Sequence, residues 1–206
     1  MALVHLKHSD APALAAAVGT AESKTSAELV LVVLPRVTEA YPAAFAGAAV
    51  AAAATLAALI FGDFDVDEWV GVPATLAAAA AVFFLVWRVV PLRLVTRAQT
   101  RRSGIDTAAH AAFSRHGVYR TSKHTGVLLF VACAERDVRV LADSGVVAAV
   151  PESVRATWGA WLLAAHTVAQ LTAAVEAIGA SAAAFLPHSD DDVDELPNAP
   201  QLEAAS

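Results

Sequence analysis

Carboxylates around one expected strand are the residues of this chain whose type and spacing suggest chemistry. Residues 138–142 (VRVLA) predict a strand, and Asp143 follows directly after it. A carboxylate at a strand end can face a crevice at a sheet edge, and Ca²⁺ or Mg²⁺ prefers oxygen ligands. Glu135 and Asp137 lie at the other end of the strand, about 17 Å away, so they cannot share an ion with Asp143. We expect either a divalent cation at Asp143, completed by other groups, or an aspartate that bonds backbone amides at a turn or helix start.

A modest basic patch lies before the strand expected at residues 126–132. It consists of Arg115, Arg120 and Lys123, beside His124. Such a patch suits a phosphate group or an anionic lipid headgroup, and the alternative is an ordinary solvated turn. No established catalytic motif accompanies it, so catalytic residues stay unassigned and no organic cofactor is expected.

Composition narrows the class of protein. The chain has 206 residues, a net charge of −6, 57% hydrophobic residues and a mean hydropathy of +0.56. The negative charge argues against nucleic-acid binding, and the apolar excess requires a location. Cys133 is the only cysteine, which excludes an intrachain disulfide and a cysteine-based zinc site.

Two apolar stretches predict a transmembrane helical hairpin. Residues 41–61 carry no charge, and residues 69–91 carry one, Arg88 near the end. Each is long enough to cross a hydrocarbon core about 30 Å thick. Side chains that favour the membrane interface lie near the helix ends: Tyr41, Trp69, Trp87 and Arg88.

Charge also predicts the orientation of the hairpin. The loop at residues 62–68 is acidic, whereas Arg93, Arg97, Arg101 and Arg102 follow the second helix. Positive residues stay on the cytoplasmic side, and no signal peptide precedes the first strand. We therefore expect a multi-pass protein of a bacterial inner membrane, with both termini and the water-soluble domain in the cytoplasm.

The remaining residues predict an α/β domain. Strands are expected at 27–34, 126–132 and 138–142, and helices at 12–23, 98–116, 152–160 and 162–185. The last two strands should form an antiparallel hairpin. The domain is therefore discontinuous, built from residues 1–40 and 96–186, and residues 187–206 are expected to form an acidic disordered tail.

The soluble segments resemble the TPM domain family. The resemblance rests on AESKTSAELVLVVLPR and on RHGVYRTSKHTGVLLFVACAERDVRVLADSGV. A moderately specific pattern within the second run is carried by Thr125, Gly126, Glu135, Arg136, Asp143 and Gly145. The chain is similar in particular to the bacterial membrane branch of this family, in which a helix pair interrupts the domain. The family implies an α/β/α sandwich with a small mixed sheet. It includes phosphatases, calcium binders and accessory factors of membrane complexes. A Gly-Tyr-Gly turn common in exported members is replaced here by Asp143-Ser144-Gly145.

Two functions follow as expectations. The first is a non-enzymatic, membrane-tethered accessory or interaction module, whose partners are the lipid bilayer and either another membrane protein or further copies of this chain. The second is a metal-dependent phosphatase acting on phosphate esters, with Asp143 holding the metal. The hairpin and the lack of a catalytic motif favour the first.

Overall fold

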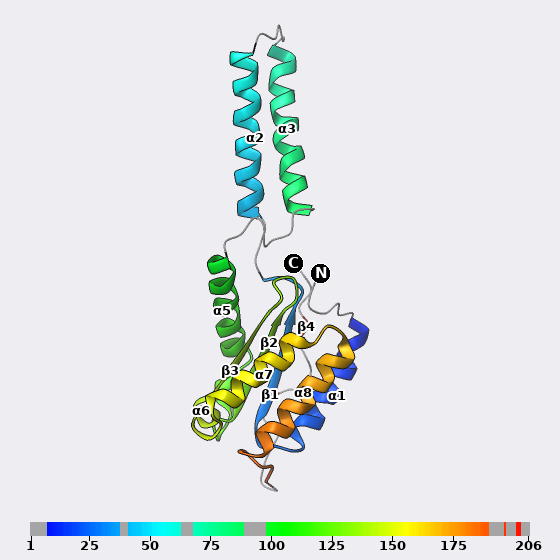
Figure 1. Ribbon diagram of the computed structural model, residues 1–206, viewed down its shortest axis with the longest axis vertical. Coiled ribbons are helices and arrows are strands. Elements are labelled where there is room, and N and C mark those ends of the chain that lie inside the picture. Colours follow the sequence, from blue (N-terminus) through cyan, green and yellow to red (C-terminus); the bar gives the residue numbers. More distant parts are fainter. Residues whose placement is uncertain are drawn as a thin grey trace. The chain divides into compact units, whose positions relative to one another are not determined.

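A computed structural model describes residues 8–37, 41–62, 68–88, 98–189, 196 and 201–202. The chain divides into two compact units. Met1–Val37 and Arg102–Ser206 form one unit, and Thr38–Arg101 form the other (Figure 1).

The first unit is built on a small mixed sheet with strand order β3-β2-β1-β4. β1 (Glu28–Leu34) and β2 (Gly126–Ala132) are parallel, whereas β3 (Asp137–Ala142) runs antiparallel to β2. All seven residues of β2 are buried, which accounts for its apolar character on both faces. The three longer strands and the antiparallel hairpin are confirmed.

Helices cover both faces of the sheet. One face packs against α1 (Ala11–Glu22), α7 (Glu152–Ala164) and α8 (Val168–Ala183), and the other packs against α5 (Ala98–Arg115) (Figure 1). Successive β1 residues alternate between these two cores. The unit is therefore an α/β/α sandwich, as predicted.

The second unit is a pair of apolar helices, α2 (Tyr41–Phe61) and α3 (Glu68–Arg88). Both are long and apolar enough to cross a membrane. They pack against each other at Gly47, where an added Cβ would meet the side chains of Val82 and Val86 at 3.3 and 3.5 Å. Residues 89–91 of the expected second helix lie outside the described residues.

The helical region after β3 differs from expectation. A short helix, α6 (Ser144–Ala149), precedes α7, and the expected boundary near residue 161 falls instead between Ala164 and Val168. Thr167 is the N-cap of α8, because its side-chain oxygen accepts a hydrogen bond from the Gln170 amide at 3.2 Å. Gln170 Oε1 in turn accepts from the His166 amide at 2.8 Å.

Parts of the segment 187–206, which was predicted to be a disordered tail, lie on the sandwich in the described residues. Gln201 and Leu202 form β4, parallel to β1 and opposite Val32 and Val33. Leu196 is only 9% exposed and packs in the core on the α5 face. The acidic composition predicted that the tail is solvated. The burial of Leu196 and the pairing of Gln201 and Leu202 with β1 place these three residues on the sandwich instead.

Candidate functional site

Asp143 lies at the end of the sheet opposite the one at which ligands usually bind. Because β3 is antiparallel, Ala142 pairs with Val127 near the start of β2, and Asp137 pairs with Ala132 at its end. Asp143 therefore lies where the two parallel strands begin. Ligand crevices in α/β sheets form at the carboxyl ends of parallel strands, so Asp143 does not face a crevice of this kind.

Asp143 is the N-cap of α6. Its Oδ1 accepts a hydrogen bond from the Ser144 amide at 2.7 Å. Its Oδ2 lies 3.1 Å from Nδ1 of His124, and the Asp143 side chain is only 14% exposed. Of the two alternatives left by the sequence, this geometry is that of an aspartate at a helix start, with a histidine as an additional partner.

The loop that presents His124 is held by its backbone. His124 has a φ of +54°, an uncommon conformation for a residue with a side chain. Its amide donates to the Thr121 carbonyl at 3.0 Å, and its carbonyl accepts from the Gly145 amide at 3.0 Å. A Cβ at Gly145 would lie 2.6 and 2.7 Å from the carbonyl oxygens of Lys123 and His124, so this contact requires glycine. The conformation of His124 is thus imposed by its neighbours.

The His124–Asp143 pair has the geometry of a carboxylate-oriented imidazole. Assigning the proton to Nδ1, which faces the carboxylate, leaves the lone pair of the neutral ring on Nε2. The imidazole is 60% exposed, so this nitrogen is accessible to solvent. Such an arrangement can accept a proton or bind a phosphoryl group or metal. Sequence analysis placed His124 only in the basic patch, because a contact across nineteen positions leaves no local signal.

The described residues do not assemble an oxygen-rich cation site around Asp143. Both of its carboxylate oxygens have protein partners, and no group of three histidine, cysteine, aspartate or glutamate side chains gathers within the described ranges. A hard cation wants six or more oxygens. The divalent cation at Asp143 stays a prediction, and no step is assigned to it.

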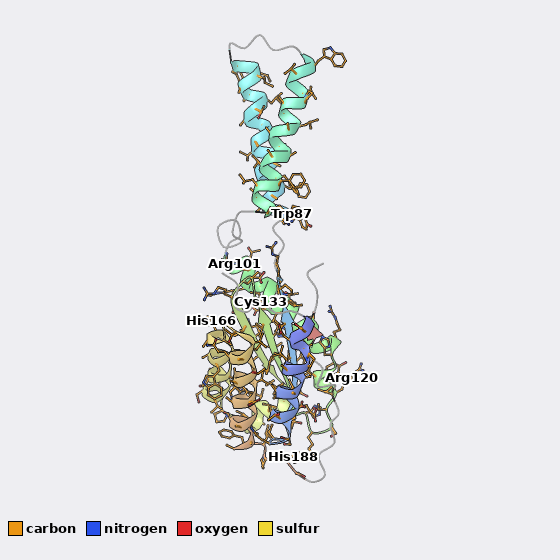
Figure 2. All side chains as sticks on the ribbon, turned by 90° about the vertical axis from the view of Figure 1, so that its right-hand side faces the viewer. Trp87, Arg101, Arg120, Cys133, His166 and His188 are labelled. Carbon is orange, nitrogen blue, oxygen red and sulfur yellow. The ribbon has the colours of Figure 1, made fainter. Side chains whose placement is uncertain are left out.

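The basic patch lies at the same end of the sandwich as Asp143. Arg115 ends α5, and Arg120 and Lys123 are exposed in the segment that leads into β2. The Arg120 guanidinium lies 5.5 Å from the centroid of the Tyr119 ring, and its Nε donates to the Tyr119 hydroxyl at 3.2 Å (Figure 2).

The basic patch lies at the carboxyl end of α5, a helix of 18 residues, and in the segment that follows it. The phosphate and the lipid alternatives for Arg115, Arg120 and Lys123 both stay predictions.

The residues predicted to lie at the membrane interface are found at both ends of the hairpin, in different surroundings. Trp87 lies at one end of the hairpin (Figure 2). Tyr41 stacks on Trp87, with ring centroids 6.0 Å apart, and the ring centroids of Phe45 and Phe83 are 5.0 Å apart. At the other end Trp69 is 90% exposed. Tyr41 and Trp87 thus form part of an aromatic cluster. The sequence analysis missed the phenylalanines in this cluster because it treated them as ordinary apolar residues.

At the carboxyl end of the parallel strands, side chains serve structure. Glu135 Oε1 accepts a hydrogen bond from the Val37 amide at 3.0 Å. Arg139 joins β3 to α5 through Asp106, and its Nη1 also donates to Asp137 at 2.6 Å. Partial burial lowers the pKa of Arg139, but the hydrogen bonds and charges of these two carboxylates outweigh it and raise the pKa above its ordinary value.

These features define an α/β/α sandwich with an apolar helical hairpin inserted after its first strand. Residues 89–159 match a family model, TPM_phosphatase, described as TPM domain. This segment of the chain is therefore similar to TPM domains, and the sandwich fold expected from the resemblance is confirmed.

A solved structure has the same fold. It is the NMR structure of BA42 protein from the psychrophilic bacterium Bizionia argentinensis, with a TM-score of 0.58 and 18% sequence identity over 96% of this chain and 95% of that one. A comparison with curated proteins gives no match.

Proposed function

We propose that this protein is a membrane-tethered interaction module: α2 and α3 cross a bacterial inner membrane, and the TPM domain binds a membrane protein on the cytoplasmic side. The observation that carries the proposal is the outward-facing apolar surface of the hairpin. Phe61 is 88% exposed and Val50 is 69% exposed. In the apolar 18-residue stretch of each helix, 6% is buried in α2 and 0% in α3. Apolar patches of this extent mark a membrane or protein interface.

The distribution of charge supports the orientation. The loop between the helices carries Asp63, Asp65 and Asp67, α3 begins with Glu68, and the residues after α3 are rich in arginine. In this arrangement only the acidic loop crosses the bilayer, and both termini stay in the cytoplasm.

Co-purification tests the interaction role. The full-length protein is isolated from its native membrane in a mild detergent, and bound proteins are identified by quantitative mass spectrometry. An unrelated two-helix membrane protein with a tag of the same kind serves as the control. We expect a reproducible, stoichiometric membrane protein partner, and its absence across several detergents would contradict the proposal.

Phosphate-ester hydrolysis is the second candidate function. It is motivated by the name of the matching family model and by the exposed imidazole of His124 beside Asp143. The test compares wild type with His124→Gln and Asp143→Asn, with and without calcium, magnesium and manganese. Turnover that both substitutions abolish, without a change in melting temperature, would establish a hydrolase. Turnover that is absent or unchanged in the variants would remove this candidate.

A further inference from the structure

The imidazole of His124 is held at one nitrogen and exposed to solvent at the other. Its Nδ1 lies 3.1 Å from Oδ2 of Asp143, whose side chain is only 14% exposed, whereas the His124 side chain is 60% exposed. A carboxylate that accepts a hydrogen bond from Nδ1 leaves the lone pair of the neutral ring on Nε2 and raises the basicity of the ring. The outward nitrogen of His124 therefore has the properties of a nucleophile.

The backbone around His124 fixes the geometry of this pair. The φ of His124 is +54°, in a region that residues with side chains rarely occupy. Its amide donates to the Thr121 carbonyl and its carbonyl accepts from the Gly145 amide, both at 3.0 Å. Asp143 is fixed in turn as the N-cap of α6, through the Ser144 amide. The two side chains thus come from segments that are bonded to each other, and a rare backbone conformation of this kind is typical of functional sites.

A second histidine shows what is particular to this pair. His110 on α5 is also exposed, and its Nδ1 lies 2.7 Å from the backbone carbonyl oxygen of Asp106. A carbonyl orients the ring as a carboxylate does, but it carries no net charge. A carboxylate also stabilises the positive ring that forms when Nε2 bonds to an electrophile. Of these two exposed rings, His124 is the better nucleophile.

The residues around His124 suit an anionic electrophile. Lys123 precedes it directly and Arg120 lies earlier in the same segment, and both side chains are exposed. Arg115 ends the helix that leads into this segment. Positive groups of this kind stabilise the oxygens of a phosphoryl group during transfer. A histidine nucleophile among basic side chains therefore fits a phosphoryl group as its electrophile.

We propose that Nε2 of His124 is a phosphoryl acceptor and that Asp143 is its positioning residue. The donor class is an acyl phosphate or a phosphoramidate, whose leaving group departs without an added proton. The lone pair of Nε2 forms the N–P bond, the bond from phosphorus to the leaving group breaks, and the leaving group keeps that electron pair. The Nδ1 proton stays between the ring and Asp143, whose charge offsets the positive charge of the ring. The product is a phosphohistidine. The inference needs neither a protein partner nor turnover, so it goes beyond both functions proposed above.

Labelling with a small phosphoryl donor tests the proposal. The full-length protein in detergent is incubated with phosphoramidate, and the phosphorylation of His124 and His110 is followed in the same molecules by site-resolved mass spectrometry. His110 is the internal control for an exposed, oriented ring. We expect His124 to react at least about tenfold faster than His110. The adduct should be labile in acid and stable in alkali, as an N–P bond requires.

Substitutions separate chemistry from structure. Asparagine caps a helix about as well as aspartate, so Asp143→Asn should leave the melting temperature unchanged. It should lower the labelling rate of His124 about 10–100-fold and leave that of His110 unchanged. His110→Gln is the matched variant and should leave the labelling of His124 unchanged. Equal rates at His124 and His110, or an unchanged rate at His124 in Asp143→Asn, would overturn the proposal.

The tautomer of the ring is a second readout, which a merely structural role of Asp143 would not move. Long-range ¹⁵N NMR spectra of the histidine rings report which nitrogen carries the proton. We expect the proton of neutral His124 on Nδ1 in the wild type and a loss of this preference in Asp143→Asn. A wild-type ring with its proton on Nε2 would overturn the proposal, because its outward nitrogen would have no lone pair to donate.

The outcomes distinguish this inference from the functions proposed above. Labelling of His124 without turnover of phosphate esters would keep the phosphoryl acceptor and remove the hydrolysis candidate. Turnover that His124→Gln abolishes, with no N–P adduct at His124 in rapidly quenched samples or after phosphoramidate, would keep hydrolysis and reject the acceptor. Co-purification of a membrane protein partner tests the interaction module by itself, since neither result at His124 depends on it.

Discussion

The hairpin and the sandwich place the same kinds of side chain on opposite sides. In β2 all seven residues are buried, whereas in α2 the described buried set consists of Ala44. Trp158 is fully buried in the sandwich, and Trp69 is 90% exposed on the hairpin. Residue type alone therefore does not define a core. The medium around each unit does, and the exposed apolar surface of the hairpin suits a medium that is itself apolar, as proposed above.

Matched arginine substitutions should separate the two units most strongly. Ala53 near the middle of α2 and Ala156 on α7 are both exposed. Arginine at the centre of a membrane helix costs about 2.5–3.5 kcal/mol for insertion, whereas arginine on a wetted helix surface costs little. We expect Ala53→Arg to lower the membrane-bound fraction severely and Ala156→Arg to leave it unchanged, as measured by carbonate extraction and immunoblotting. Equal membrane recovery of both variants would remove the distinction between the units.

Glycine substitutions sharpen the comparison at the level of packing. At Gly179 on α8, an added Cβ would lie 2.5 and 2.6 Å from Cβ and Cα of Ala21 on α1. At Gly47 the nearest atoms are flexible ends of valine side chains at 3.3 Å or more. Gly179→Ala should lower the free energy of unfolding by about 1–3 kcal/mol, because two helix backbones must separate. Gly47→Ala should be near neutral. Thermal and chemical denaturation in detergent measure both. A near-neutral Gly179→Ala, or a loss for Gly47→Ala as large as that for Gly179→Ala, would contradict the difference in packing.

A polar clamp distinguishes the sandwich by a smaller effect. Arg139 links Asp106 on α5 to Asp137 on β3, and the described part of the hairpin contains no such ion pair. A double-mutant cycle with Arg139→Met and Asp106→Asn should give a coupling of about 0.2–1 kcal/mol, since Asp106 is half exposed. A coupling near zero would make the clamp incidental.

The pH dependence of this clamp has a defined sign. The raised pKa of Arg139 means that its charged form is favoured in the folded state. The stability contributed by Arg139 is fully present below the ordinary arginine pKa and is lost only as pH rises through the folded value. Its contribution should therefore stay constant from about pH 6 to about pH 9. Loss of the coupling within this range would have to arise from another group.

The main elements of both units could be predicted because their signals are local. β2 is an unbroken apolar run, and 41–61 is an uncharged stretch of membrane-spanning length. The boundary between α7 and α8 was predicted near residue 161 instead of at Thr167, although Thr167 and Gln170 have the spacing of a capping box, which marks a helix start. The position of α6 was missed because a six-residue helix has too little periodicity to detect.

The site was less predictable than the fold. Asp143 was found from its position after a strand, but its partner His124 depends on how the loop packs against Gly145. β4 was hidden in an acidic tail, because pairing with an existing strand edge needs no apolar pattern of its own. Contacts between distant segments thus decided both features.

Cysteine labelling in intact cells tests the membrane topology most directly. Cys133 is 4% exposed, so wild-type protein provides a low background. Asp65→Cys places a thiol between the hairpin helices, and Lys24→Cys places one on the exposed surface of the sandwich. The account predicts that a membrane-impermeant maleimide labels Asp65→Cys in intact cells and labels Lys24→Cys only after lysis. Labelling of Lys24→Cys from outside, or protection of both positions, would contradict the proposal that the hairpin crosses the membrane and the sandwich stays in the cytoplasm.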